Sequence, residues 1–456
     1  MRLLVHAPLC RGREADGERG QAMHLQPAPN RFVVLVLLVI TALVVAACGG
    51  GAAEEVSPTA GGVVTTATAA MPSGSPAASP TGSPAASPAA SPAASPVGTP
   101  GGTPTGGTGG TQDLTGWATP SDTEDGTIAL LLPETKTARY ESADRPFFEA
   151  YFQELCPNCQ IIYNNANQDA ATQQQQAEAA LTNGAQVLVL DPVDSAAAAA
   201  IAEQAQAQGV PVIAYDRAIL NSEGVSYYIS FDNVEVGRLQ AQTLVDALEG
   251  VDDPQIVMIN GSPTDNNAGE FKEGAHSVFD PLVDAGELTI AMEYDTPDWS
   301  PDQAQNEMQQ ALTALGNQVD GVYAANDGTA SGAIAAMKAA GISPLPPVTG
   351  QDAELAGIQR ILIGEQYMTV YKAIQPEAEI AAELAFALLT GQDVPESVTG
   401  GQTANNGATD VPAILLTPVA VTQDNIADTV VADEFWTVDE ICTPEYADAC
   451  AEAGLE

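Results

Sequence analysis

From about Gly126 onward, short apolar runs alternate with helix-forming stretches, and this alternation limits what the chain can fold into. The runs TIALLL at 127–132 and VLVL at 187–190 are continuously apolar, which is typical of strands buried on both faces. Between them, residues 170–182 have a helical composition that stops at Asn183-Gly184. Repeated strand–helix–strand units predict parallel sheets covered by helices.

The alternation occurs in two successive series, which are separated by a predicted helix at 234–249. Predicted strands of the first series are 127–132, 160–163, 187–190, 210–215 and 227–231, with helices at 147–155, 170–182 and 195–208. Predicted strands of the second series are 255–259, 288–292, 321–324 and 347–349, with helices at 267–284, 301–315 and 328–340. Two such series predict two doubly wound α/β lobes, and ligands bind these sheets at the carboxyl ends of their strands.

Polar side chains gather where the predicted strands end. They are Glu134, Asp191, Asp216, Arg217, the run NGSPTDNN at 260–267, Asn326, Asp327, Gln351 and Asp352. Carboxylate and amide oxygens accept hydrogen bonds from hydroxyl groups, whereas guanidinium, ammonium and amide NH₂ groups donate them. This set of side chains therefore suits a hydroxyl-rich ligand such as a sugar.

The charge of the chain is extreme, with 14 Lys and Arg against 59 Asp and Glu and a formal net charge of −45. Such a surface repels nucleic acid and anionic lipid headgroups, so neither is expected as a partner. Five of the 14 cations precede Cys48. The nine that follow are Lys136, Arg139, Arg145, Arg217, Arg238, Lys272, Lys338, Arg360 and Lys372. Because positive charge is scarce, a cation inside a motif is a strong candidate for a specific role.

The N-terminal region has the pattern of an export signal. Residues 32–47 form an apolar run that is short for a membrane span and has the length of a signal-peptide hydrophobic region. The run ends in VAACG at 45–49, which resembles a bacterial lipobox and implies cleavage before Cys48 and lipidation of that residue. A plain signal peptide or an uncleaved anchor is the alternative. Met23 is a second candidate start, because residues 1–22 have mixed charge.

After Cys48, residues 48–125 are dominated by Gly, Ser, Thr, Pro and Ala, with an SPAASP repeat near 83–96. Such a composition cannot bury a core, so the segment is predicted to be a disordered tether. A glycosylated stalk is the alternative. The segment is expected to hold the folded part at the outer face of the cell membrane, in the periplasm or at the cell surface.

Four cysteines fall in the region that is expected to be folded, namely Cys156, Cys159, Cys442 and Cys450. Outside the cytoplasm they predict two local disulfides, one in the C-x-x-C motif and one near the C-terminus. A zinc site and a thioredoxin-like redox motif are the alternatives. The C-x-x-C follows the helical stretch 147–155 instead of opening a helix, which disfavours the redox motif.

Several longer motifs resemble one family. They are AYDRAI at 214–219, YYISFDNVEVGRLQA at 227–241, GSPTDNNA at 261–268, AANDGTASGAI at 324–334, GQDAELAGIQRI at 350–361, MTVYKAI at 368–374 and DVPAILLTPVAV at 410–421. In this order they resemble the D-xylose-binding proteins of bacterial ABC import and the related broad-specificity aldose-binding proteins. The resemblance spans about 127–433.

The resemblance implies a type I periplasmic-binding fold, an α/β fold with two doubly wound parallel-sheet lobes joined by three hinge crossings. The expected crossings lie near 231–233, 369–371 and 411–415. The expected N-terminal lobe comprises 126–232 and 372–411, the C-terminal lobe comprises 233–371 and 412–433, and a tail with a disulfide follows at 434–456.

The resemblance also implies which residues bind the sugar. The expected hydrogen-bonding ligands are Arg139, Asp216, Arg217, Asn267, Asn326, Asp352 and Lys372, with Asp265 as a weaker candidate, and the expected ring-stacking residues are Tyr140 and Trp299. Asn326 and Asp327 also suit the N-cap of the helix that follows, so we expect one to cap and the other to bind. Tyr140 stands where the xylose binders have a larger aromatic, and 132–139 looks more like the broad-specificity relatives. The choice among xylose, glucose, galactose and arabinose therefore stays open.

The implied function is that of a monomeric solute-binding lipoprotein, without cofactor or metal, that delivers a monosaccharide, D-xylose foremost, to an ABC importer permease. The alternatives are a broad-specificity aldose binder, a component of a sugar-sensing receptor, a binder of another solute, and a surface carbohydrate-active enzyme. Several features disfavour an enzyme: the exported chain holds one histidine, His276, and carries neither a nucleophile elbow nor a G-x-x-x-x-G-K-[ST] loop. Paired carboxylates say little in a chain with 59 acids.

Overall fold

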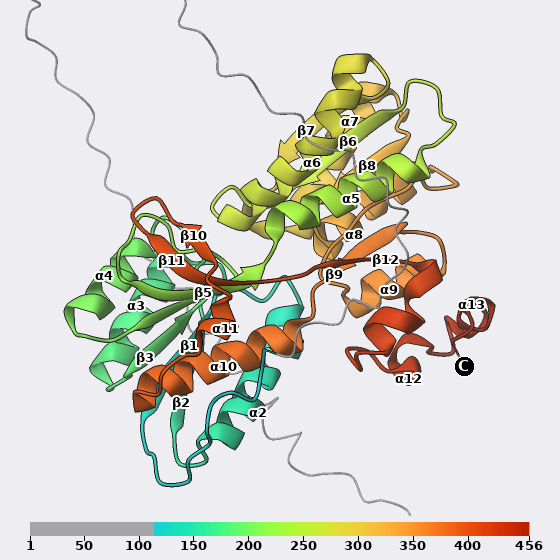
Figure 1. Ribbon diagram of the computed structural model, residues 1–456. Helices are drawn as coiled ribbons and strands as arrows, with labels where there is room; N and C mark the ends of the chain where they lie inside the picture. The colour runs from blue at the N-terminus through green and yellow to red at the C-terminus, as the bar shows by residue number, and fades with distance from the viewer. Residues whose placement is uncertain (1–113, 456) are drawn as a thin grey trace, which may run out of the picture. The chain divides into compact units, whose positions relative to one another are not determined.

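The computed structural model describes residues 114–455 (Figure 1). The predicted signal peptide at 1–47, the lipidation site Cys48 and the tether up to residue 113 lie outside the described residues. Among the residues described, no helix combines the length and the apolar character that a membrane crossing requires.

The first sheet has seven strands in the order β10-β11-β5-β4-β3-β1-β2. Their bounds are β1 Thr127–Leu132, β2 Gln160–Asn165, β3 Val187–Leu190, β4 Val212–Tyr215, β5 Val225–Phe231, β10 Thr403–Asn405 and β11 Asp410–Leu416. All neighbours pair in parallel except β10 and β11, which are antiparallel. The apolar runs at 127–132 and 187–190 therefore form strands with the predicted bounds.

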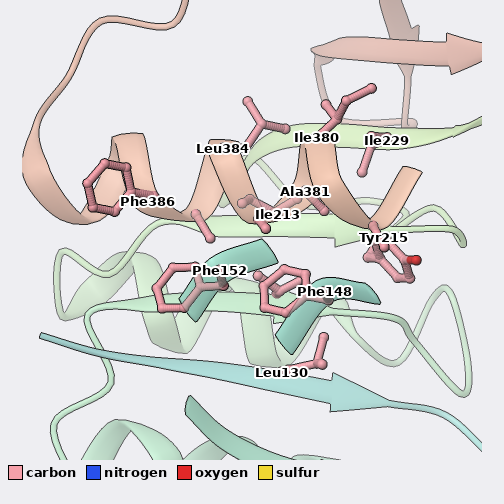
Figure 2. Packing of buried hydrophobic residues seen from close by; sticks show 14 of the residues in the cluster. Leu130, Phe148, Phe152, Ile213, Tyr215, Ile229, Ile380, Ala381, Leu384 and Phe386 are labelled. Carbon is pink, nitrogen blue, oxygen red and sulfur yellow. The ribbon is translucent and has the colours of Figure 1, made fainter. Parts of the chain in front are cut away.

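Helices cover both faces of this sheet, because successive side chains of a strand point to opposite sides. The helices are η1 Tyr140–Asp144, α2 Arg145–Leu155, α3 Ala170–Thr182, α4 Ala199–Ala207, α10 Ile374–Thr390 and α11 Glu396–Thr399. Leu130 of β1 belongs to the same core as Phe148 and Phe152 of α2 and Leu384 of α10 (Figure 2), whereas Leu131 belongs to the core on the other face, with α3 and α4. The sheet is thus doubly wound, as expected.

The second sheet has three parallel strands in the order β7-β6-β8, with bounds β6 Gln255–Asn260, β7 Thr289–Asp295 and β8 Gly321–Ala324. Four helices surround it: α5 Asn233–Ala247 and α6 Asn266–Ala285 on one face, and α7 Pro301–Leu315 and α8 Asp327–Ala339 on the other. The strand predicted at 347–349 is reduced to a single parallel bridge from Val348 to Val322. Pro346 and Pro347 precede it and have no N–H to donate to a ladder.

The chain passes between the two sheets three times. It leaves β5 at Phe231 for α5, and it leaves β9 (Met368–Tyr371) for α10. The third crossing joins β11 to β12 (Val419–Thr422), which pairs with β9 in a separate antiparallel ribbon. The expectation of a crossing at 411–415 was wrong, because β11 stays paired to β5 through Leu416. The third lobe boundary therefore follows Leu416 and does not lie between 411 and 412.

Both ends of the described chain contribute residues to hydrophobic cores, which the sequence did not predict. Residues 114–125 were expected to belong to the tether, yet Ala118 is buried in the first core and Ser121 N donates to Leu155 O at 2.9 Å. Beyond β12, the chain forms η3 Gln423–Asn425, η4 Ala427–Val431, α12 Val438–Ile441 and α13 Ala447–Ala453. These pack with α9 (Leu355–Leu362) around a core of their own. Within residues 114–455 the cysteines form two disulfides, Cys156–Cys159 and Cys442–Cys450.

Candidate functional site

A small cavity lies between the lobes, and its walls come from segments that follow strands of both sheets. The lining residues are Thr137, Tyr140, Asp216, Arg217, Asp265, Asn267, Phe271, Trp299, Asn326, Gln351, Asp352 and Lys372. Most of these side chains carry a charge, an amide or a hydroxyl group. The cavity is therefore suited to a small, polar molecule.

Nine of the ten residues predicted to bind the ligand line this cavity, and Arg139 is the exception. Three lining residues were not predicted: Thr137, Phe271 and Gln351. Gln351 follows a predicted strand, so its position carried a signal. Thr137 and Phe271 had none, since a threonine in a loop and a phenylalanine in an amphipathic helix are ordinary in any α/β protein.

Arg139 lies behind the cavity wall, where acidic side chains occupy its donors. Its Nε and Nη2 contact the Asp144 carboxylate at 2.9 and 2.5 Å, and Nη2 also contacts Glu377 at 2.7 Å. Its Nη1 lies 3.1 Å from Asp216 Oδ1 and 3.8 Å from Asp352 Oδ1. Arg139 therefore orients two carboxylates that line the cavity and does not line it itself.

Asp216 is the centre of this network. Its Oδ2 accepts a hydrogen bond of 2.9 Å from the Tyr140 hydroxyl, and its Oδ1 lies 3.5 Å from Lys372 Nζ. Burial by itself would raise the pKa of Asp216, but Arg139, Lys372 and Arg217 together hold that pKa well below its ordinary value. The carboxylate is thus a fixed negative charge, available as a hydrogen-bond acceptor.

Arg217 connects the two lobes. Its Nε forms an ion pair of 3.0 Å with Asp265 Oδ2, and the same oxygen accepts a hydrogen bond of 3.0 Å from Trp299 Nε1. Asp265 Oδ1 caps α6 by accepting from the backbone N–H of Asn267 at 2.9 Å. A helix cap in one lobe therefore fixes both a guanidinium from the other lobe and an indole ring.

Asn326 and Asp327 divide their roles differently from the prediction. Asn326 caps α8 by accepting from Thr329 N at 2.8 Å, and it also lines the cavity. Asp327 does not line the cavity, since its carboxylate accepts from Gln366 Nε2 at 2.6 Å, Glu354 N at 2.9 Å and Thr369 Oγ1 at 3.1 Å. Burial raises the pKa of Asp327 to about 7. The capping residue is thus also the residue that faces the cavity.

The site holds more acids than bases. Three buried cations, Arg139, Arg217 and Lys372, lie among the buried carboxyls of Glu134, Asp144, Asp191, Asp216, Asp265, Asp352 and Glu377. Burial raises the pKa of Asp191 and of Glu377 well above their ordinary values, which favours their neutral forms and reduces the charge imbalance. In the described part of the chain, no group of His, Cys, Asp and Glu is arranged to hold a metal ion.

Aromatic rings supply the apolar part of the lining. Phe271 and Trp299 meet edge to face, with ring centroids 6.3 Å apart. The ring of Tyr140 lies 5.4 Å from the Arg139 guanidinium and 5.5 Å from that of Arg217. Aromatic planes beside charged hydrogen-bonding groups match the two surfaces of a pyranose, which has apolar CH faces and a rim of hydroxyls.

Two doubly wound lobes with three crossings and a polar cavity at the strand ends define a two-lobed solute-binding protein. The chain belongs to the periplasmic binding protein family, whose domain profile matches residues 128–393. It is 40% identical over 314 residues to the D-xylose-binding periplasmic protein of Escherichia coli K12, covering 69% of this chain and 92% of that protein. It is 34% identical over 333 residues to the multiple sugar-binding periplasmic receptor ChvE of Rhizobium radiobacter, covering 70% and 93%.

Solved structures agree with this assignment. A carbohydrate transporter solute-binding protein from Chloroflexus aurantiacus in complex with D-glucose has a TM-score of 0.63 and 32% identity, covering 70% of this chain and 98% of that one. An ABC transporter solute-binding protein from Clostridium phytofermentans with bound β-D-glucose has a TM-score of 0.64 and 29% identity, covering 69% and 99%. The type I periplasmic-binding fold predicted from the sequence is thereby confirmed.

Proposed function

We propose that this protein is the solute-binding component of an ABC importer and that it binds a monosaccharide, D-xylose foremost, in the cavity between its lobes. The observation that carries the proposal is the cavity itself, in which carboxylates, cations, amides and aromatic rings from both lobes converge. The relatives support it, since they include D-xylose-binding periplasmic proteins at 40% and 37% identity.

In the proposed complex, the polar lining residues share the sugar hydroxyls between them. Asp216, Asp265 and Asp352 accept hydrogen bonds, Arg217 and Lys372 donate them, and the amides of Asn267 and Asn326 do both. Tyr140 and Trp299 face the sugar ring. A hydroxyl that is missing or misplaced would leave one of these buried groups unpaired, and that cost is the source of specificity. Arg139 acts by orienting Asp216.

Binding is coupled to hinge closure in this proposal. The lobes touch directly, with Ser195 N donating to Thr264 O at 2.9 Å and Asn267 Nδ2 donating to Asp216 O at 2.9 Å. A sugar that contacts both lobes adds interactions that exist only when they are closed, so it shifts the population toward the closed form. The permease then recognises the closed pair of lobes.

The remaining features concern location and partners. We infer cleavage before Cys48, lipidation of that cysteine and attachment of a monomer to the outer face of the membrane through the tether. The apolar run at 32–47 and the VAACG sequence at 45–49 support this inference. We also infer a carrier and not an enzyme, in line with relatives whose names describe binding. No cofactor is needed for such a role.

The test is calorimetry of the purified protein with xylose, glucose, galactose, arabinose and ribose, with Arg217→Ala as the control variant. Micromolar binding of xylose, about −8 kcal/mol, that the variant loses supports the proposal. Similar affinities for several aldoses place the protein with the multiple-sugar binders. A folded protein that gives no heat with any of the five sugars refutes the monosaccharide assignment.

A further inference from the structure

The residues after β12 include an extension, 434–455, that follows the stretch of about 127–433 over which the chain resembles the sugar-binding family; the family profile itself ends at residue 393. It comprises α12 and α13, which the Cys442–Cys450 disulfide links. Ile441, Cys450 and Leu455 are buried in a core shared with α9, and the side chain of Gln359 in α9 donates to the carbonyl oxygen of Ile441 at 3.3 Å. The extension is therefore fixed to the second lobe.

The extension reaches a strained loop of the binding site. Asp352, which lines the cavity, has φ 87°, and Ala353 has φ 48°, so two consecutive non-glycine residues lie in the left-handed region. Such conformations cost of order 1–3 kcal/mol each and persist only where the surroundings enforce them. The loop needs external contacts to keep the Asp352 carboxylate in place.

Three contacts supply that enforcement. The backbone N–H of Asp352 donates to Val370 O at 2.9 Å, and that of Ala353 donates to Thr369 Oγ1 at 3.2 Å; both partners belong to β9. The third comes from the extension, where Trp436 Nε1 donates to Ala353 O at 2.8 Å. Ala353 is fully buried, so without Trp436 this carbonyl would lose a partner that water could not easily replace.

A neighbouring residue of the extension contacts the second hinge crossing. The ring of Phe435 packs on that of Tyr371 with centroids 5.3 Å apart, and Tyr371 directly precedes Lys372. Lys372 Nζ and Asp352 Oδ1 form an ion pair of 3.1 Å at the cavity wall. Adjacent aromatic residues of the extension thus contact the backbone segments that carry both members of this pair.

We propose that the extension at 434–455 positions Asp352 and Lys372 for the ligand, and that Trp436 is the positioning residue. This inference rests on the proposed sugar-binding function for its affinity readout. The Trp436 hydrogen bond to Ala353 narrows the range of conformations of the loop at 352–353, so the loop loses less conformational entropy when sugar binds. The disulfide and the contacts with α9 hold Trp436 where it can do this.

The test is Trp436→Phe, which keeps an aromatic ring and removes the N–H donor. The matched control is Trp117→Phe, because Trp117 is also partly buried but packs on the first core and is not among the residues that line the cavity. Two quantities are measured well below the melting temperature: the Kd of the best-bound sugar, and the hydrogen-exchange rate of the amides at 352–353. Loss of global stability alone changes neither the Kd of the folded protein nor the exchange of one selected loop.

We expect Trp436→Phe to raise Kd by about three- to tenfold, tenfold being about 1.4 kcal/mol, and to speed exchange at 352–353. Trp117→Phe should change neither. Gln359→Ala, which loosens the extension on α9 and leaves Trp436 intact, should shift both quantities in the same direction by a smaller amount. Unchanged Kd and unchanged exchange in Trp436→Phe would overturn the proposal. If the wild-type chain binds none of the sugars, the sugar-binding function fails, and the exchange rates still decide whether Trp436 holds the loop.

Discussion

A single methyl group added at Gly261 should displace Trp299 from the cavity wall. Gly261 follows β6 and does not line the cavity, but a Cβ there would lie 2.0, 2.4 and 2.5 Å from three atoms of the Trp299 ring. To restore an ordinary contact of 3.4 Å to the nearest atom, the buried indole must move by more than 1 Å. A shift of that size breaks the 3.0 Å hydrogen bond from Trp299 Nε1 to Asp265 Oδ2.

The expected magnitudes follow from these contacts. Trp299 is proposed to face the sugar ring, and losing the burial of one such apolar contact costs about 1.5–3 kcal/mol, so Gly261→Ala should weaken sugar binding roughly tenfold to a hundredfold. Overpacking should also lower the free energy of unfolding by about 1–3 kcal/mol. Calorimetry measures the first quantity and denaturant unfolding the second, while indole fluorescence reports the environment of the ring.

Gly269→Ala is the matched control, because a Cβ at Gly269 in α6 meets no heavy atom within 4 Å. Alanine should stabilise that helix by about 0.5–1 kcal/mol and leave the affinity unchanged. If Gly261→Ala binds sugar within twofold of the wild type, Trp299 is not needed in its present position, and the reasoning is refuted.

Three further predictions concern buried acidic groups in and around the site. Burial raises the pKa of Asp327 from its ordinary 3.8 to about 7 and that of Glu354 from 4.5 to about 8. The folded state therefore holds more protons than the unfolded chain between about pH 4 and 8. The free energy of unfolding should fall as pH rises through this window, by up to about 1.4 kcal/mol per pH unit for each extra proton that the folded state binds. A free energy of unfolding that stays constant from about pH 5 to 8 would contradict this. Asp191→Asn should increase the free energy of unfolding at about pH 8 more than at about pH 5. Asp191 is fully buried, burial raises its pKa, and its two oxygens have no hydrogen-bond partner within the described structure. Equal effects of the substitution at both pH values would count against this prediction. Asp216→Asn keeps the shape of the side chain but removes the charge beside Arg139 and Lys372. It should abolish measurable sugar binding and destabilise the fold by about 3–5 kcal/mol. Near wild-type affinity in calorimetry would exclude Asp216 as the central acceptor.

Local pattern was enough to predict most secondary-structure elements. The strands at 127–132, 187–190 and 321–324 and the helices at 170–182 and 301–315 have the predicted bounds. Continuous apolar runs, helical periodicity and glycine stops are properties of neighbouring residues, so they can be read without tertiary contacts. The family resemblance likewise implied nine residues that line the cavity, and several of them follow strands at the carboxyl end, where ligands bind in this class of fold.

The tertiary structure decided what depends on contacts distant in sequence. Arg139 matches a ligand motif, yet Asp144 and Glu377 draw its guanidinium behind the cavity wall. Phe271 looks like any core residue of an amphipathic helix, and only the packing of α6 against Trp299 brings it to the lining. The third crossing moved past Leu416 because strand pairing, which joins residues far apart in the chain, extends β11 along β5.

The sequence by itself therefore determined the class of fold, the family and the chemical character of the ligand, because these follow from local periodicity and from motifs of neighbouring residues. The structure alone decided which charged groups reach the cavity, which orient those that do, and how the C-terminal extension packs against the binding loop. Side-chain direction and long-range packing depend on the whole fold, and no local pattern encodes them.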